Sequence, residues 1–300
     1  MKRKEPATKN QKYLAIFLAV TMFLSVFLIL FTAGSNTDSD NKVSTPAVEN
    51  NSSTISFSQI PGKQVHHQFN SIADGLNMSP QGVTNAIYID LQKSKGTPLE
   101  QVFNNTDMNN FYGAEVTKRY RPNYANGSGF ELHQIPGQKI LIPLGAVPYH
   151  SYNLLARTNN TYDLWNVVGN PVILGSRQSV KSVIDVLEGN ATSTSEFNQI
   201  LSHAEPEDVI FQEVATKTNT TNIPAEQYYR DLKKLDDGSY AQTNIFLNPE
   251  PGVSKNITAL QENSSKRGVT YNVTISGNIT KLKMSSDFAS LYNETQSLSL

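Results

Sequence analysis

The chain has 300 residues, a net charge of −1, 17% charged residues and no cysteine. The lack of cysteine excludes disulfides, thiolate metal sites and a catalytic thiol, so the fold must rest on its core. Lysine and arginine are dispersed after an N-terminal cluster, and without a basic stripe we exclude nucleic acid as a partner.

The first forty residues predict a membrane anchor. A basic segment, residues 1–12, precedes about 22 nearly uninterrupted apolar residues at 13–34, which at about 1.5 Å per helical residue cross the roughly 30 Å hydrocarbon core. Asp38 and Asp40 follow the span. The positive-inside rule therefore places the N-terminus in the cytoplasm and the bulk of the chain outside, as a single-pass protein of the cell membrane. A cleaved signal, with small residues at 32–34, is the alternative.

Residues 35–54 form a polar stalk without apolar periodicity, and the folded part begins near Ile55. Beyond the anchor lie thirteen N-x-S/T sequons, whereas the composition gives about five by chance. They predict a glycosylated outer surface, although a polar exterior rich in Asn, Ser and Thr also generates sequons by composition. The acceptors are Asn50, Asn51, Asn77, Asn104, Asn126, Asn159, Asn190, Asn219, Asn256, Asn263, Asn272, Asn278 and Asn293.

Residues 55–170 are interpreted as a first outer domain. Ser79 and Pro80 predict the start of a helix, and the alternation in 84–91 predicts a strand. Thr97 and Pro98 predict a short helix over 99–105. A strand over 114–121 and four strand-like segments, which predict an antiparallel meander, then follow at 129–135, 139–145, 150–157 and 162–169.

Residues 171–300 are interpreted as a second outer domain, although one large domain is also possible. It opens with a strand at 172–175 and a helix from Ser176 to Gly189. Further helices are predicted at 195–204, 224–235 (from Pro224), 254–264 and 286–294, with strands at 208–216, 241–248, 268–276 and 278–285 and a hairpin turn at Gly277 and Asn278.

The pattern predicts an α+β fold with antiparallel sheet after the transmembrane helix. Strand, helix, strand, strand and helix over residues 240–293 are most of a ferredoxin-like unit. That fold's usual fourth strand is not evident after Glu294. An earlier strand could supply it.

Three segments carry a resemblance: NPVILGSRQSVKSVIDVLEGN, the preceding NAIYIDLQKSKGTPLEQ and the following EFNQILSHAEPEDVIFQEV. Together they resemble uncharacterised membrane-anchored exported proteins of archaea and some bacteria. The shared features are a strand ending in V-x-G and a helix V-x-x-x-I-D-V-x-x-G. The resemblance covers about half of the outer portion and implies a surface protein, without an activity or a site residue to transfer.

No motif predicts a catalytic residue, a metal site or a cofactor. His66 and His67 are adjacent and cannot chelate one ion together, and His133 with His150 leaves a two-histidine site open only if their strands pair. The calcium-like spacings at 105–109 and 236–238 lack the complete loop pattern and are interpreted as turns.

Two weaker signals remain. Ser176 is interpreted as an N-cap, and with Arg177 and the exposed amides it is a candidate anion site. Trp165 with Tyr149, Tyr152 and Tyr162 is either a sugar-stacking face or, more commonly for such a row, part of the core.

These observations predict a non-enzymatic binding or scaffolding protein of the cell envelope, with the membrane and an envelope protein or glycan as partners. A surface hydrolase or carbohydrate-active enzyme with dispersed site residues is one alternative. An accessory subunit of a membrane transport or secretion assembly is another. A deep cleft with two close carboxylates would favour the enzyme.

Overall fold

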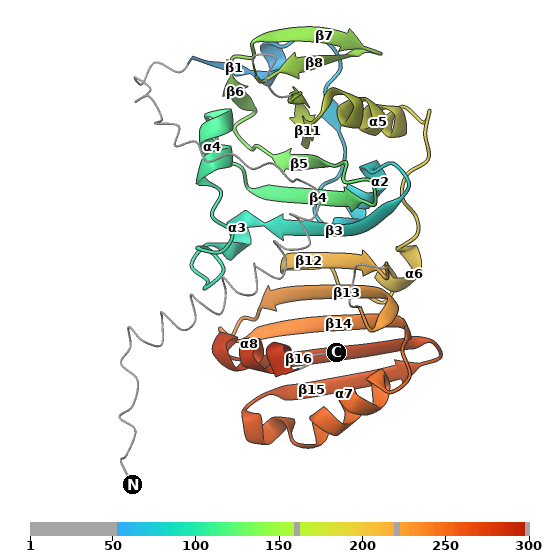
Figure 1. Cartoon of the computed structure of the whole chain (residues 1–300). Coiled ribbons are helices and arrows are strands. Elements are labelled where there is room, and N and C mark those ends of the chain that lie inside the picture. The colour runs from blue at the N-terminus through green and yellow to red at the C-terminus, as the bar shows by residue number, and fades with distance from the viewer. Residues whose placement is uncertain (1–52, 159–162, 219–222, 298–300) are drawn as a thin grey trace, which may run out of the picture.

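The structure, a computed structural model, describes residues 53–158, 163–218 and 223–297 (Figure 1). In these ranges no helix combines the length and apolar character needed to cross a membrane. The predicted anchor at 13–34, the basic segment before it and the stalk as far as residue 52 lie outside the described residues, as does Tyr162.

One large sheet dominates the molecule, and all neighbouring strands in it are antiparallel (Figure 1). The predicted mixed α+β class with antiparallel sheet is confirmed. From one edge to the other the twelve strands are β15 (Thr270–Ser276), β16 (Ile279–Ser286), β14 (Tyr240–Pro249), β13 (Ala225–Lys234), β12 (Val209–Thr216), β3 (Val83–Asp90), β4 (Lys118–Tyr124), β5 (Phe130–Gln134), β11 (Val172–Gly175), β9 (Trp165–Val167), β8 (Tyr152–Ala156) and β7 (Gly145–Tyr149).

Two small strand pairs and a set of helices complete the described fold. β1 (Thr54–Ser56) pairs with β6 (Lys139–Leu141), and β2 (Val65–His66) pairs in parallel with β10 (Gly169–Asn170). The α-helices are α2 (Ile72–Met78), α3 (Leu91–Ser94), α4 (Thr106–Tyr112), α5 (Arg177–Leu187), α6 (Asn198–Leu201), α7 (Val253–Glu262) and α8 (Phe288–Ser297), and the 3-10 helices are η1 (Phe57–Gln59) and η2 (Ser264–Arg267).

The N-terminal and C-terminal parts of the chain meet where β3 pairs with β12, so the sheet runs through both (Figure 1). β11, which follows residue 170, pairs with β5 and β9 of the earlier part. The division of the chain into outer domains at residue 170 stays a prediction.

One face of the sheet carries a continuous hydrophobic core. Successive residues of a strand point to opposite faces, and on this face Tyr88, Tyr120, Val214 and Ile245 are all 1% exposed or less. Helices α2, α5 and α6 cover it with their apolar sides. On this face, therefore, helices are packed against the sheet.

The opposite face is covered at its two ends rather than throughout. Near β15 and β16, helices α7 and α8 pack Ile257 and Leu291 against Leu282 and Met284. Near β5 and β11, Tyr112 of α4 and other residues form a separate cluster with Val172 and Leu174. The middle of this face, over β3, β4, β12 and β13, lies between the two clusters.

The predicted helix over 224–235 is wrong, because this segment is strand β13. Its Glu, Gln, Arg, Leu and Lys residues favour a helix when judged alone. β13 is instead hydrogen-bonded on both sides, to β12 and to β14, and alternates Tyr229 and Asp231 on one face with Arg230 and Leu232 on the other. Tertiary pairing overrides the local propensity.

Other predictions in the first part also need correction. Ser79 does not begin a helix. It is the C-cap of α2, whose own start is a capping box of Ser71 and Asp74. The predicted helix over 99–105 is wrong, because residues 98–103 form consecutive turns and residues 104–105 have no regular structure.

The best-supported helix prediction is confirmed. α5 begins after Ser176, whose hydroxyl accepts a 3.1 Å hydrogen bond from the amide of Ser179, and Val183 and Ile184 are fully buried. The predicted β15–β16 hairpin with its turn at 277–278 is confirmed as well. α6 is shorter than the predicted 195–204 helix.

Candidate functional site

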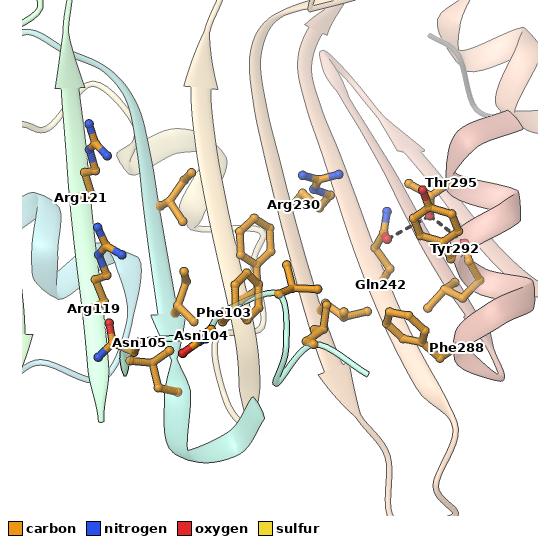
Figure 2. Close-up of a pocket in the computed structure, with 18 residues that line it drawn as sticks. Phe103, Asn104, Asn105, Arg119, Arg121, Arg230, Gln242, Phe288, Tyr292 and Thr295 are labelled. Atoms are coloured by element: carbon orange, nitrogen blue, oxygen red, sulfur yellow. Dashed lines mark hydrogen bonds between the residues drawn. The ribbon is translucent and has the colours of Figure 1, made fainter. Parts of the chain in front are cut away.

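A groove of about 270 Å³ occupies the middle of the face between the two clusters (Figure 2). Its floor is formed by β3, β4, β12, β13 and β14, and its sides by the segment 99–105 and by helix α8. Figure 2 shows Phe103 on one side and Phe288 and Tyr292 on the other. The two sides come from segments almost two hundred residues apart.

The strand register arranges the floor into two rows that run across the strands. In the first row Arg119 is opposite Ile89, Ile89 is opposite Phe211, Phe211 is opposite Leu232, and Leu232 is opposite Gln242. These directly opposed side chains lie on one face of the sheet. The row thus begins with a cation on β4, continues through three apolar side chains and ends with an amide on β14.

The second row runs beside the first and contains more charge. Arg121 is opposite Ile87, Ile87 opposite Glu213, Glu213 opposite Arg230 and Arg230 opposite Asn244. Residues two apart on a strand share a face, so Arg119 and Arg121 project from β4 on the same side (Figure 2). Both rows therefore begin with arginine.

The apolar part of the groove is built from aliphatic and aromatic side chains. Phe103 stacks on Phe211, with ring centroids 6.0 Å apart and an interplanar angle of 13°. Phe103 is held there by a turn in which its amide donates a 2.9 Å hydrogen bond to the carbonyl of Leu99. Leu99, Leu232 and Phe288 add further apolar lining.

The charged residues that line the groove are all arginines: Arg119, Arg121 and Arg230. Arg119 donates two hydrogen bonds to Glu131, at 2.6 and 3.0 Å, and Arg230 donates one of 2.8 Å to the buried Glu213. The Arg230 guanidinium also lies 5.4 Å from the Phe211 ring centroid. Paired guanidinium groups of this kind are held in fixed orientations.

The pKa values of the carboxylates paired with Arg119 and Arg230 are shifted in opposite directions. Burial raises the pKa of Glu213 above its ordinary value, and the nearby Arg230 charge only partly offsets that effect. Burial also acts to raise the pKa of Glu131, but hydrogen bonds and charge from His133 and Arg119 outweigh it and hold that pKa well below its usual range. Glu131 therefore keeps its negative charge beside Arg119 to a lower pH than Glu213 keeps its charge beside Arg230.

His133 extends this arrangement into the core. It is fully buried, one ring nitrogen lies 2.9 Å from Glu131, and the other lies 2.9 Å from the Tyr112 hydroxyl. A series of hydrogen bonds from Arg119 through Glu131 and His133 to Tyr112 connects the groove floor to the hydrophobic cluster that contains Tyr112. Its satisfied hydrogen bonds fix the position of Arg119.

The histidines singled out from the sequence are not brought together. His133 lies inside β5, whereas His150 is an exposed residue of the β7–β8 turn and lies 3.2 Å from Asp185. Within the described ranges, no group of three or more His, Cys, Asp or Glu side chains is arranged to hold a metal ion.

The candidate anion site at Ser176 and Arg177 lies at the start of α5, away from the groove. The amide of Arg177 donates a 3.0 Å hydrogen bond to the carboxylate of Asp163, and its guanidinium lies 5.3 Å from the Trp165 ring centroid. An acidic side chain of the protein thus contacts this helix start, and binding of an external anion there stays a prediction.

The remaining candidates from the sequence lie in a turn or in the hydrophobic core. Asp237 is in the β13–β14 turn and accepts hydrogen bonds from Ser239, as the turn interpretation predicts. Tyr152 is 3% exposed and belongs to the main core, with Tyr149 and Trp165 packed beside it.

Sequence reasoning missed the groove, and only part of it carried a signal. The segment Lys118-Arg119-Tyr120-Arg121 alternates, so a buried Tyr120 on one face implies two arginines on the other. Arg230 carried no such signal, because its segment reads as a helix.

Fold and groove define a mixed α+β protein with a large antiparallel sheet and a groove lined by apolar, amide and arginine side chains. Residues 68–188 match a family model described as a family N-terminal domain, from an archaeal-type uncharacterised family. The match begins just before α2 and ends just after α5, and it covers less than half of the chain. No curated protein matches the chain.

Proposed function

We propose that this protein is a single-pass, membrane-anchored binding protein of the cell envelope, and that its ligand binds in the groove between residues 99–105 and α8. The observation that carries the binding function is the groove itself, in which apolar side chains and a few fixed polar groups converge. Small-molecule sites commonly combine these two features.

The groove favours binding over the hydrolase alternative. Two close carboxylates would have favoured a carbohydrate-active enzyme. The charged side chains that line the groove are arginines, and Glu131 and Glu213, the ion-pair partners of Arg119 and Arg230, are not part of the lining. A ligand in the groove therefore meets cations and apolar surface first.

The sequons support an extracytoplasmic position for the described part. Nine of the thirteen acceptor asparagines lie in the described ranges, and each of the nine is exposed. Other asparagines, such as Asn166 and Asn244, are buried. Exposure is what glycan attachment requires, and the glycoprotein assignment remains part of the proposal.

The binding function is tested with the full chain purified from its native membrane. Leu232→Trp places an indole in the groove, and Ile275→Trp, at a side chain that is 55% exposed on β15, is the matched control. Mass spectrometry of extracted small molecules is expected to find a compound that accompanies the wild type and the Ile275 variant but not the Leu232 variant. If no compound distinguishes the three, the groove is not a ligand site.

Topology is tested separately. Protease added to intact cells whose wall admits it is expected to digest the outer part and spare an N-terminal tag, because the flanking charges orient the span. Release of a soluble form that begins near residue 35 would show a cleaved signal instead.

A further inference from the structure

We propose that the ligand of the groove is a neutral molecule with an extended apolar chain, which lies along the first row of the floor, across β3, β12 and β13. This inference rests on the proposed binding function and names the chemical class of the ligand. Two observations carry it. The row presents a continuous apolar surface, and the polar side chains of the lining already have partners within the protein.

The apolar surface follows the strand register. Ile89, Phe211 and Leu232 are directly opposed on three successive strands. Adjacent strands are about 4.8 Å apart, so these side chains form a strip that extends about 10 Å from β3 to β13. Phe103 stands on one side of the groove and Phe288 on the other (Figure 2). An extended hydrocarbon chain along the strip therefore contacts apolar side chains below it and on both sides.

The arginines of the lining interact with other groups of the protein. Arg119 donates two hydrogen bonds to Glu131, and Arg230 donates one to Glu213. Arg121 also has a partner within the protein. The structure itself thus supplies the carboxylates for Arg119 and Arg230, and none of the three arginines depends on a ligand for a partner.

An anionic head group at Arg119 would compete with a carboxylate that is already in place. Hydrogen bonds and charge from His133 and Arg119 hold the pKa of Glu131 well below its usual range, so Glu131 is ionised at neutral pH. Both of its oxygens accept from the Arg119 guanidinium. Displacing it would leave a largely buried carboxylate without that partner, which is unfavourable. A neutral ligand requires no displacement.

The amide at the other end of the row is satisfied in the same way. Gln242 donates a 3.0 Å hydrogen bond to Asn244 and accepts one of 3.0 Å from the hydroxyl of Thr295. Polar groups at both ends of the first row therefore make their hydrogen bonds inside the protein. The surface that remains for a ligand is the apolar strip between them.

Photolabelling of the full chain in lipid nanodiscs at neutral pH tests the inference, with photoreactive decanol as the neutral probe and photoreactive decanoate as its anionic counterpart. Labelled peptides are identified by mass spectrometry. For each probe, labelling of the Leu232→Trp variant, in which an indole fills the strip, is the background. Above that background, we expect decanol to label peptides of β12 and α8 at least tenfold more than decanoate does.

A variant of Glu131 tests the role of the internal ion pair. Glu131→Gln retains the shape of the side chain and removes the charge that holds Arg119, so the ratio of decanoate to decanol labelling should rise at least tenfold. Glu115→Gln, at an exposed residue paired with Lys95, is the matched control for loss of a negative charge and should leave the ratio unchanged. Circular dichroism shows whether each variant is folded, and if Glu131→Gln is not, the comparison of probes on the wild type decides alone.

The outcomes separate the two proposals. Labelling of the wild-type groove by decanoate at or above the level of decanol would overturn the neutral ligand and leave the binding function standing. An unchanged ratio in folded Glu131→Gln would also overturn the neutral ligand. If neither probe labelled the groove above background, the apolar chain would be overturned, and the extraction experiment, which uses no probe, would decide the binding function separately.

Discussion

Replacing Arg230 with Met should destabilise the protein by about 3 to 5 kcal/mol, because it leaves Glu213 buried without its ion-pair partner. The side chains of both residues are at most 10% exposed, and the 2.8 Å hydrogen bond between them lies in the centre of the sheet. Replacing both residues with Met removes the uncompensated charge as well. The double variant should therefore recover most of the loss, to within about 1 to 2 kcal/mol of the wild type.

The pH dependence of the Arg230→Met variant provides an internal check. Burial already raises the pKa of Glu213 in the folded protein, and loss of the arginine removes an opposing effect. A carboxyl group whose folded-state pKa lies above its unfolded value destabilises the fold progressively as the pH rises from the unfolded value through the folded one. The variant should consequently lose more stability at pH 8 than at pH 5, whereas the double variant, which lacks this carboxyl group, should compare more favourably with the wild type at pH 8 than at pH 5.

Urea unfolding of the full chain, followed by circular dichroism at both pH values, measures these free energies. Additive losses in the double variant, together with no pH dependence in the single variant, would refute the view that an uncompensated buried charge causes the effect. Glu213→Gln is a useful comparison, because it retains the shape of the side chain and leaves Arg230 without its anionic partner.

Three further predictions concern stability and use the same unfolding assay. Ile184→Ala in α5 should cost about 2 to 4 kcal/mol. Lys181 is half-buried and its ammonium lies 4.7 Å from the Tyr149 ring centroid, so Lys181→Ala should cost at most about 1 kcal/mol, and equal losses would refute the helix face. Gly75→Ala should destabilise by about 1 to 3 kcal/mol, despite the better helix propensity of alanine, because its Cβ would lie 2.4 Å from the Tyr120 ring; a neutral result would show that the ring moves. Hydrogen bonds from Lys281 and Lys283 lower the pKa of Glu205 to about 2. Glu205→Gln should therefore cost about 0.5 to 1 kcal/mol at pH 7, a modest value because the carboxylate is half-exposed. The difference in stability between variant and wild type should vanish as the pH falls from about 4.3 through about 2.

The parts of the fold that the sequence predicts well are those determined by local pattern. In α5, Ser176 caps the helix and Val180, Val183 and Ile184 recur at helical spacing, and all three valine and isoleucine side chains are buried as the spacing requires. The β15–β16 hairpin likewise carries its signal in two adjacent residues at the turn. Both elements can be predicted without knowing which other elements pack against them.

The segment that became β13 shows the limit of that approach. Its helix-forming residues are outweighed by two long strand partners, β12 and β14, and β14 follows it directly through the turn at Asp236 and Asp237. A strand with polar residues on both faces lacks the alternation that identifies strands in sequence. The buried polar residues Arg230 and Asp231 find their partners only inside the assembled sheet.

The groove is harder still to predict, because its residues share no local pattern. Arg119, Ile89, Phe211 and Leu232 stand in one row only because of the strand register. The row exists only once β3 has paired with β4 on one side and with β12 on the other. One residue of slippage in β12 would turn Phe211 to the opposite face and bring Gln212 into the row. Gln212 instead donates to Tyr229 and accepts from the amide of Ile72, and both bonds hold β12 in its observed register. Polar contacts buried on one face of the sheet thus determine which side chains line the groove on the other.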